Sequence, residues 1–181
     1  YILKERRPKN IAEIPFLPIE FFKNKNIICD KKDVERKFFS SGTEGEKSTH
    51  YISDLSLYEQ SFNTAFNKFY GDISDYCILA LLPTYQENKN SSLMYMINSL
   101  IYQTKNPYSG FHMYDFKKLA DIINSAEKNG QKTILFGVTY ALLDFAKAYP
   151  MQLNNTIIME TGGMKGKRKE LLKDEVHEIL K

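Results

Sequence analysis

Three short apolar runs alternate with segments of helical periodicity, and this alternation constrains the fold more than any other feature of the sequence. The runs lie at 76–82, 132–138 and 155–160, and the first reads YCILALL. Apolar residues recur every three or four positions in the segments 91–104, 115–128, 140–148 and 167–180. Apolar runs of this length are typical of strands buried on both faces. Because strands and helices alternate, we predict an α/β fold with three layers, a mostly parallel sheet with helices on both faces.

The region before these runs is less regular. Three prolines interrupt residues 1–26, and residues 35–41 read as a short strand that leads into a glycine-rich loop. A helix is predicted from Ser53 or Ser56 to Tyr70, because Ser56 and Glu59 fit a capping box and Gly71 fits a C-cap. Its apolar face is expected at Leu55, Tyr58, Phe62, Ala65, Phe66 and Phe69.

Composition narrows the function classes. A net charge of +3 over 181 residues is too small to imply a nucleic-acid partner. No apolar run approaches the ~20 residues of a membrane-spanning helix, and no signal peptide is evident. Cys29 and Cys77 cannot form a disulfide framework, and the three histidines lack the spacing of a zinc site. We therefore expect a cytoplasmic protein with no protein-held metal and no membrane span.

One loop has the composition of an anion-binding loop. Residues 39–47 read FSSGTEGEK, so hydroxyls, two glycines and a lysine follow a predicted strand. Glycines at positions 42 and 45 allow backbone N–H groups to converge on a phosphate. The glycine spacing differs from that of a P-loop, and by composition alone the segment could equally be a plain turn.

Two further loops follow predicted strands. Ligands of open α/β sheets bind at the carboxyl ends of the strands. Gly162 and Gly163 leave bare backbone at one such end, where a flat ring could lie, and a run of cations at 165–169 follows. Cations at the start of a helix are unfavourable with the helix dipole, so a bound anion nearby would relieve that cost; alternatively, the run is simply solvated. Tyr140, which follows another predicted strand, could equally be the start of a helix.

Four segments together resemble a known family. They read IPFLPIEFFK at 14–23, FFSSGTEGEKSTHY at 38–51, LFGVTYALLDFAKA at 135–148 and METGGMKGKRKEL at 159–171. The loop SSGTEG resembles the Ser/Thr/Gly-rich loop of acyl-adenylate-forming enzymes. The set, in this order, resembles the acyl-protein synthetases of bacterial bioluminescence and, more distantly, the phenylacetate–coenzyme A ligases.

The resemblance implies a ligase that uses ATP and Mg²⁺ to activate a carboxylic acid, such as a fatty acid, as an acyl-adenylate. A thiol of a protein cysteine, a carrier protein or coenzyme A would then accept the acyl group. The phosphate-binding loop carries over to Ser40, Ser41, Gly42, Thr43, Glu44, Gly45 and Lys47. The adenine-binding segment carries over to Thr161, Gly162, Gly163 and Met164. Tyr140 matches a position near the acyl pocket; no catalytic residue is assigned.

The sequence also departs from that family. Glu44 replaces the second threonine of the usual loop and either points away, helps to hold Mg²⁺ or weakens ATP binding. The family's ribose-binding aspartate and C-terminal lysine do not occur in residues 1–181. We therefore expect residues 1–181 to form the N-terminal portion of one adenylate-forming (AMP-binding) domain, inactive by itself. The alternative is a non-catalytic nucleotide-binding or interaction module that kept the fold; self-association is left open.

Overall fold

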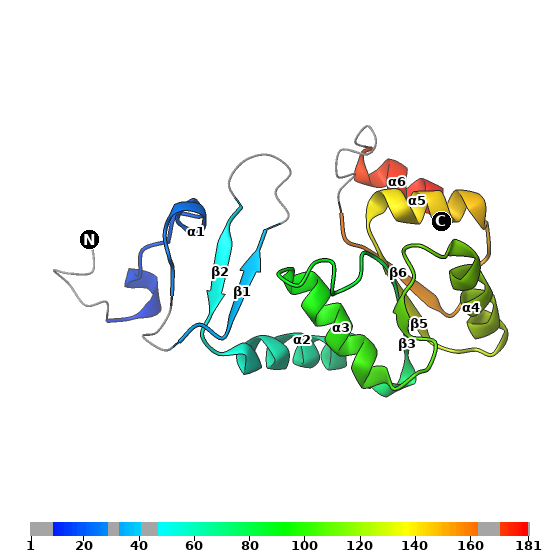
Figure 1. Cartoon of the computed structure of the whole chain (residues 1–181), viewed down its shortest axis with the longest axis horizontal. Coiled ribbons are helices and arrows are strands. Elements are labelled where there is room, and N and C mark those ends of the chain that lie inside the picture. Colours follow the sequence, from blue (N-terminus) through cyan, green and yellow to red (C-terminus); the bar gives the residue numbers. More distant parts are fainter. Residues whose placement is uncertain (1–8, 29–32, 41–46, 163–170, 181) are drawn as a thin grey trace. The chain divides into compact units, whose positions relative to one another are not determined.

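The computed structural model describes residues 9–28, 33–40, 47–162 and 171–180. The chain divides into two compact units, Tyr1–Ser53 and Asp54–Lys181 (Figure 1). Among the described residues, no helix is long and apolar enough to cross a membrane. The two units are described separately below.

The smaller unit is built around an antiparallel hairpin. Strand β1 (Arg36–Phe39) pairs with β2 (Thr49–Ile52), so that Phe39 lies opposite Thr49. The predicted strand before the glycine-rich loop is therefore confirmed, whereas β2 is not among the predicted strands. A 3-10 turn, η2 (Ile11–Glu13), and a one-turn helix, α1 (Phe21–Asn24), precede the hairpin.

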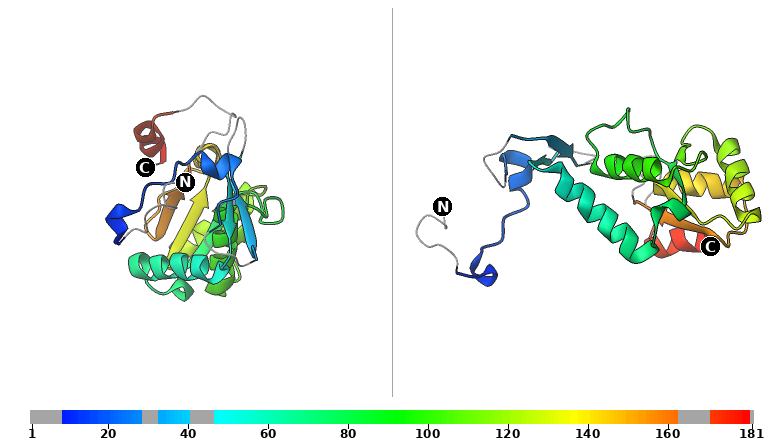
Figure 2. Two further views of the ribbon diagram at one scale, coloured as in Figure 1. Left: turned by 90° about the vertical axis from the view of Figure 1, so that its left-hand side faces the viewer. Right: turned by 90° about the horizontal axis from the view of Figure 1, so that it is seen from below.

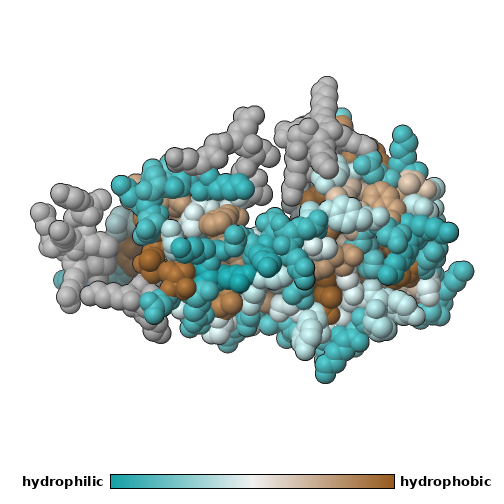
Figure 3. All heavy atoms as spheres, in the orientation of Figure 1, coloured by the Kyte–Doolittle hydropathy of each residue, from teal (hydrophilic) through white to brown (hydrophobic). Residues whose placement is uncertain are grey.

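The smaller unit buries little of its apolar surface. Phe38 is its one fully buried side chain among the described residues. Ile11, Phe16 and Ile19 are exposed, and Phe16 is as accessible as in an extended chain. Brown patches in Figure 3 show apolar side chains at the surface of this unit. Its described part therefore has no apolar core of its own comparable to that of the larger unit.

The larger unit is an α/β layer structure. In chain order its elements are α2 (Leu55–Tyr70), η3 (Ile73–Asp75), β3 (Cys77–Leu81), α3 (Ser92–Thr104), β4 (Gly110–Phe111), α4 (Phe116–Lys128), β5 (Thr133–Gly137), α5 (Thr139–Ala148), β6 (Thr156–Glu160) and α6 (Lys173–Leu180). The strands lie in the order β4-β3-β5-β6 and every pairing is parallel. Helices α2 and α3 cover one face of the sheet, and α4 and α5 cover the other (Figures 1 and 2). The predicted three-layer fold is therefore confirmed.

The core follows the apolar runs. All five residues of β3 and all five of β5 are buried, as predicted for central strands. Strand β6 is only half-buried, and Ile157 is 41% exposed, because β6 lies at the edge of the four-stranded sheet. The second edge strand, β4, has two residues and carries no apolar run, which is why the sequence did not predict it.

Side-chain caps start three of the helices. Ser91 accepts from the N–H of Met94 at the start of α3, and Asp115 accepts from that of Lys118 at the start of α4. The predicted capping box of α2 is wrong: Asp54, not Ser56, is the N-cap and accepts from both the N–H and the hydroxyl of Ser56. The other half of that predicted box, Glu59, instead accepts from the Tyr95 hydroxyl of α3.

Two predicted apolar faces are partly wrong. In α2, Phe62 and Phe66 are buried but Phe69 is 72% exposed, and the next residue, Tyr70, packs on the core in its place. At the last helix, Val176 of α6 is buried, while Leu172, which precedes α6, and Ile179 are exposed. The predicted start of this helix at residue 167 lies outside the described residues.

Candidate functional site

The candidate site of the larger unit lies at the carboxyl edge of its sheet. Parallel strands end at the same edge, so the segments after β3, β4, β5 and β6 all emerge there. The chain leaves β3 toward β4 on one side and later passes through β5 to β6 on the other. The strand order therefore reverses between β3 and β5, which is the position at which open α/β sheets bind ligands.

A carboxylate joins the ends of β5 and β6. Glu160, the last residue of β6, accepts a short hydrogen bond from the hydroxyl of Thr139, the first residue of α5. The same oxygen accepts from the N–H of Gly162 at 2.7 Å. Thr139 is buried and Glu160 is half-buried. We call this pair of hydrogen bonds the Glu160 clip; it fixes the first turn of α5 against the segment after β6.

Thr161, the residue after Glu160, adds one further hydrogen bond between the ends of β6 and β5. Thr161 donates its N–H to the carbonyl oxygen of Gly137 at 2.9 Å, and its hydroxyl donates to the same oxygen at 3.1 Å. The Thr161 side chain is therefore turned back toward β5. The hydroxyl of Thr161, one of the predicted adenine-binding residues, is therefore already engaged within the fold.

Gly162 presents open backbone at this edge. Its φ is +80°, a conformation that side chains other than glycine rarely adopt. A Cβ built on it would have no atom of the described residues within 4 Å, so no described part of the chain fills the space beside this backbone. This is the arrangement that a flat ring would need in order to approach the backbone. Gly163 and Met164, predicted to continue this surface, lie outside the described residues.

Tyr140 lies in the first turn of α5, beside the Glu160 clip. It is half-buried and packs against the core and against the small apolar cluster of Leu143 and Val176. The structure thus brings Tyr140, Thr161 and Gly162 to one edge of the sheet. Their predicted roles in binding a ligand stay predictions.

A second carboxylate joins the segments after β3 and β4. Glu87 accepts from the N–H and the hydroxyl of Thr84 at 2.6 and 2.7 Å, and from the hydroxyl of Tyr114 at 2.7 Å. These hydrogen bonds hold the pKa of Glu87 below its ordinary value. The pKa of Tyr114 is raised, chiefly because its hydroxyl donates to Glu87, and the nearby Tyr140 adds to the shift. The segments after β3, β4 and β5 are therefore neighbours at this edge.

Sequence reasoning missed Thr139, Glu160, Glu87 and Tyr114. Thr139 and Glu160 had a usable signal, since both stand directly at the end of an apolar run. Glu87 and Tyr114 had none, because their partnership joins residues 27 positions apart. His112 was also passed over; it is buried at the end of β4, and burial lowers the pKa of its imidazole.

The predicted phosphate-binding loop belongs to the smaller unit. Ser40 donates its N–H to the carbonyl of Ser48, and its hydroxyl accepts from the N–H of Ser48, both at 3.0 Å. These bonds close the hairpin at the base of the loop, where Lys47 is exposed. The loop thus follows an antiparallel strand, not a strand of the parallel sheet. Ser41, Gly42, Thr43, Glu44 and Gly45 lie outside the described residues.

The described residues offer neither a reactive cysteine nor a cluster of metal ligands. Cys77 is buried, and burial raises the pKa of its thiol despite a weak hydrogen bond from Ser109, which makes it a poor nucleophile. Cys29 lies outside the described residues. Within the described ranges, no three His, Cys, Asp or Glu side chains come together as a metal site would require.

Comparison with known proteins adds one finding. The model of a family described as "Acyl-protein synthetase, LuxE" matches residues 6–180. No curated protein and no solved structure matches the chain. The family match covers both units and both candidate loops.

Proposed function

Because this chain belongs to the acyl-protein synthetase LuxE family, we propose that it takes part in ATP-dependent activation of a carboxylic acid and transfer of the acyl group to a thiol. A carboxylate oxygen of the acid attacks the α-phosphorus of ATP, the bond to the β-phosphate breaks, and pyrophosphate leaves. The thiol then loses its proton and its sulfur attacks the acyl carbonyl. The bond between the acyl carbon and the α-phosphate oxygen breaks, and AMP leaves with that oxygen. The family match over residues 6–180 is the observation that carries this proposal.

Two groups of predicted site residues have separate roles in this proposal. The hydroxyls and glycines from Ser40 to Gly45, with Lys47, would bind the phosphates, since N–H, O–H and ammonium groups all donate to phosphate oxygens. The hydroxyl of Ser40 accepts from the N–H of Ser48, and in this proposal its own proton would be donated to a phosphate oxygen. Thr161 and Gly162, with the two residues that follow, would lie along the adenine.

Mg²⁺ accompanies ATP and would neutralise charge on the triphosphate when bound. Carboxylate oxygen is a preferred ligand of this ion, and the loop has two carboxylates, Glu44 and Glu46, of which Glu44 is among the proposed phosphate-binding residues. In this proposal Glu44 holds the metal and does not oppose the phosphates. Changing Glu44 to threonine should then raise the Mg²⁺ concentration needed for ATP binding; unchanged Mg²⁺ and ATP dependence would place the carboxylate in solvent.

The acid would enter beside Tyr140, and the acceptor thiol is left open among a protein cysteine, a carrier protein and coenzyme A. Fixed positions of the reacting groups matter, because misplacement by about 1 Å can cost ~100-fold in rate. The Glu160 clip favours such a role for this edge, since it fixes the backbone on both sides of the proposed adenine position.

The test is acid-dependent release of pyrophosphate from ATP, measured with straight-chain acids from short to long. We expect release with a preferred chain length. If no acid in the panel caused pyrophosphate release, the ligase proposal would be overturned in favour of a nucleotide-binding module without catalysis.

Two glycines provide a matched pair for the nucleotide site. Gly162 and Gly71 have φ of +80° and +87°, and a Cβ on either meets open space. Gly162→Ala and Gly71→Ala should therefore cost similar stability through backbone strain. Only Gly162→Ala should weaken ATP binding, measured by calorimetry, because Gly71 ends α2 away from the carboxyl edge. Equal ATP affinity in the two variants would contradict the proposed adenine position.

A further inference from the structure

A groove runs along helix α4, away from the residues discussed so far. Its volume is about 330 Å³, which is within the range typical of small-molecule sites. One wall is the segment 106–108, which precedes β4, and the other wall is α4 itself. Cys77 and Gln131 border the groove where β3 and β5 begin. Every lining residue belongs to the larger unit and to the described part of the chain.

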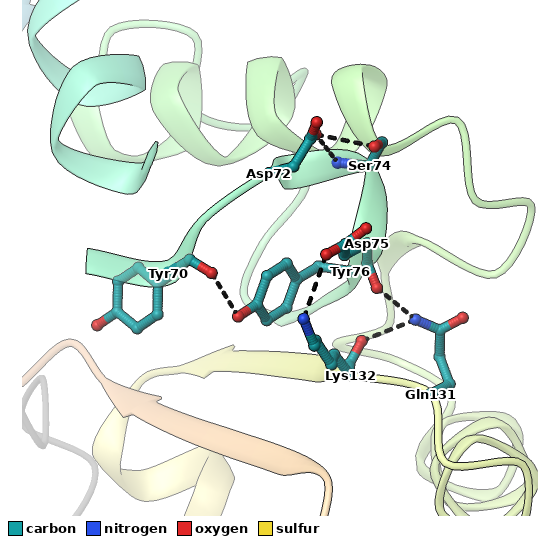
Figure 4. A network of polar contacts seen from close by, with 7 residues as sticks. All are labelled: Tyr70, Asp72, Ser74, Asp75, Tyr76, Gln131 and Lys132. Atoms are coloured by element: carbon teal, nitrogen blue, oxygen red, sulfur yellow. Dashed lines mark hydrogen bonds and ion pairs between the residues drawn. The ribbon is translucent and has the colours of Figure 1, made fainter. Parts of the chain in front are cut away.

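The amino-edge end of the groove holds a hydrogen-bond acceptor whose direction is fixed (Figure 4). The side-chain nitrogen of Gln131 donates to the carbonyl oxygens of Asp75 at 2.7 Å and of Lys132 at 3.0 Å. Only the NH₂ group of an amide can face two carbonyl oxygens, so the amide cannot turn over and its own oxygen points away from both. An ion pair between the side chains of Lys132 and Asp75, at 3.2 Å, braces the same two residues.

The Gln131 side-chain oxygen is available to a ligand. It accepts a hydrogen bond from none of the described residues. Gln131 is half-buried, yet this oxygen is not among the sealed polar atoms of the described chain that lack a partner, so it can be reached from outside. A donor group of a ligand would therefore satisfy an acceptor that the fold already holds in place.

The wall opposite α4 holds a donor that is fixed in the same way. The side-chain oxygen of Asn106 accepts from the N–H of Tyr108 at 3.0 Å. Only the oxygen of an amide can face an N–H group, so the NH₂ group of Asn106 points the other way. This NH₂ group donates to none of the described residues. Asn106 and Gln131 thus border one groove with an unused donor and an unused acceptor, both oriented by the fold.

Other lining residues offer apolar surface. Pro107, Ile122 and Ala126 present hydrocarbon, and Cys77 adds a sulfur surface that behaves as a small hydrophobe. The ring of Tyr108, which is 62% exposed, is a face on which another flat ring can stack. Apolar walls with a few oriented polar groups are typical of a site that binds a small molecule in one orientation.

The charges along the groove cancel. Lys118 and Asp121, about one turn apart on α4, are the charged residues among those that line it. A net charge of zero gives no attraction for a ligand with several negative charges, such as a nucleoside triphosphate. The groove therefore favours an uncharged ligand.

We propose that the groove along α4 binds an uncharged nucleobase or nucleoside, at a site separate from the candidate nucleotide site at the carboxyl edge. A nucleobase is flat, stacks on aromatic rings, and carries an N–H donor next to an acceptor on its edge. The donor would face the oxygen of Gln131, and the acceptor would face the NH₂ group of Asn106. Adenine has this pattern in its amino group and the neighbouring ring nitrogen, so adenosine is a suitable probe. The inference does not depend on the proposed function.

A reporter can be placed in the groove because the chain contains no tryptophan. Tyr108→Trp introduces one on the groove wall and keeps a flat ring there, and Tyr102→Trp introduces one at an exposed position of α3 as the control. Adenosine should quench the fluorescence of the first protein saturably and leave that of the second unchanged. Equal responses, or no response of the Tyr108→Trp protein, would overturn the proposal.

The hydrogen-bond pattern supplies a second readout. Purine riboside, which lacks the amino group of adenosine, should bind the Tyr108→Trp protein about tenfold more weakly, because the Gln131 oxygen then has no donor. Asn106→Asp keeps an oxygen for the N–H of Tyr108 but removes the NH₂ group, so it should weaken adenosine binding as well. Asn124→Asp makes the same change at an exposed position outside the groove and should have no effect. Equal affinities for the two nucleosides, or of the two variants for adenosine, would overturn the assigned orientation and with it the proposal.

Competition distinguishes the groove from the candidate nucleotide site. ATP should not displace adenosine from the Tyr108→Trp protein, and Gly162→Ala should leave the adenosine affinity unchanged. Displacement by ATP, or loss of quenching on Gly162→Ala, would place the nucleoside at the carboxyl edge and overturn the proposal. Acid-dependent pyrophosphate release without adenosine binding in the groove would overturn this inference alone, and adenosine binding without any release would overturn the proposed function alone.

A plug tests the groove itself. Ser125→Phe, in the Tyr108→Trp protein, fills the groove from an exposed position, while Asn124→Phe adds the same ring outside it. We expect the first to abolish saturable quenching by adenosine and the second to leave it unchanged, with matching thermal unfolding. Equal quenching in the two variants contradicts the proposal.

Discussion

Two carboxylates hold the two ends of strand β6, and they do so with different consequences. At the start of the strand, Glu127 of α4 accepts from the N–H groups of Asn154 and Asn155 and from the hydroxyl of Thr156, at 2.6–3.1 Å. At its end, Glu160 accepts from Thr139 and from the N–H of Gly162. Both are carboxylates that accept N–H and O–H donors near a strand terminus.

The difference lies in what each carboxylate fixes. The partners of Glu127 are Asn154 and Asn155, in the connection from α5 to β6, and Thr156, the first residue of β6. None of the three is a proposed ligand-binding residue. The partners of Glu160 include Gly162, whose backbone faces open space. We conclude that the first contact stabilises the fold, whereas the second also positions backbone that a ligand can reach. Four predictions test that contrast.

The largest effect is expected where α5 packs on β5, beside the Glu160 clip. A Cβ on Gly137 would lie 2.5 Å from Cγ of Leu142, so Gly137→Ala should destabilise the protein by about 1–3 kcal/mol. Gly110→Ala is the control, since its Cβ would meet the His112 ring at an ordinary 3.6 Å. Urea unfolding of both variants measures the difference; equal stabilities would show that α5 can move away from β5 at little cost.

The next effect is expected at the start of β6. Glu127→Ala removes the acceptor of several hydrogen bonds and should lower the free energy of unfolding by about 1–2 kcal/mol. Asn124→Ala, at an exposed position one turn earlier, should change it by less than ~0.5 kcal/mol. ATP affinity should not change in either variant. If Glu127→Ala weakened ATP binding, the start of β6 would also affect the proposed nucleotide site, and the contrast between the two ends of β6 would be wrong.

Two buried threonines compare the edges directly. Thr139→Val removes the hydroxyl that donates to Glu160, and Thr133→Val removes one that donates to the Gln131 carbonyl at the opposite edge. Each should cost about 1 kcal/mol of stability. Only Thr139→Val should also weaken ATP binding, because it loosens the clip that fixes Gly162. Calorimetric titration of both variants decides this, and an identical affinity would assign the clip to stability alone.

The smallest effect concerns pH. Burial alone would raise the pKa of the Glu127 carboxyl, but the hydrogen bonds from Thr156, Asn154 and Asn155 outweigh it and hold the pKa below its ordinary 4.5. The contribution of the charged form is therefore complete above pH 4.5 and is lost as pH falls through the folded-state pKa. The stability difference between the wild type and Glu127→Gln should shrink on acidification below that point. A constant difference would show that the charge of Glu127 contributes nothing.

Much of the larger unit could be predicted from the sequence. The apolar runs at β3, β5 and β6 and the helical periodicity of α3, α4 and α5 were sufficient, because burial on both faces or on one face leaves a direct pattern in the residues. The sequence-based prediction failed where burial depends on the surrounding tertiary structure and where a strand is very short. Phe69 has the right spacing for the core, yet its side chain is exposed and the next residue, Tyr70, packs on the core instead. Strand β4 is too short to leave any pattern.

The candidate site was likewise predictable only in part. Tyr140, Thr161 and Gly162 could be found from their positions after apolar runs, and the structure does bring them to one edge. The pairing of Thr139 with Glu160 could not be found, since the two are 21 residues apart and neither belongs to a motif. The groove along α4 was also invisible, because its opposite wall comes from a connection with no periodicity.

The sequence by itself therefore determined the family, the α/β class and the strands and helices of the sheet, because these depend on local periodicity and on contiguous motifs. Only the tertiary structure decided which carboxylate caps α2, which aromatic side chains are buried, how Glu160 joins two strand ends, and where α4 leaves a groove. The physical reason is the range of the interactions. Hydrophobic periodicity acts between neighbours in the chain, whereas hydrogen bonds and packing join residues that the crossovers of a parallel sheet bring together from distant positions.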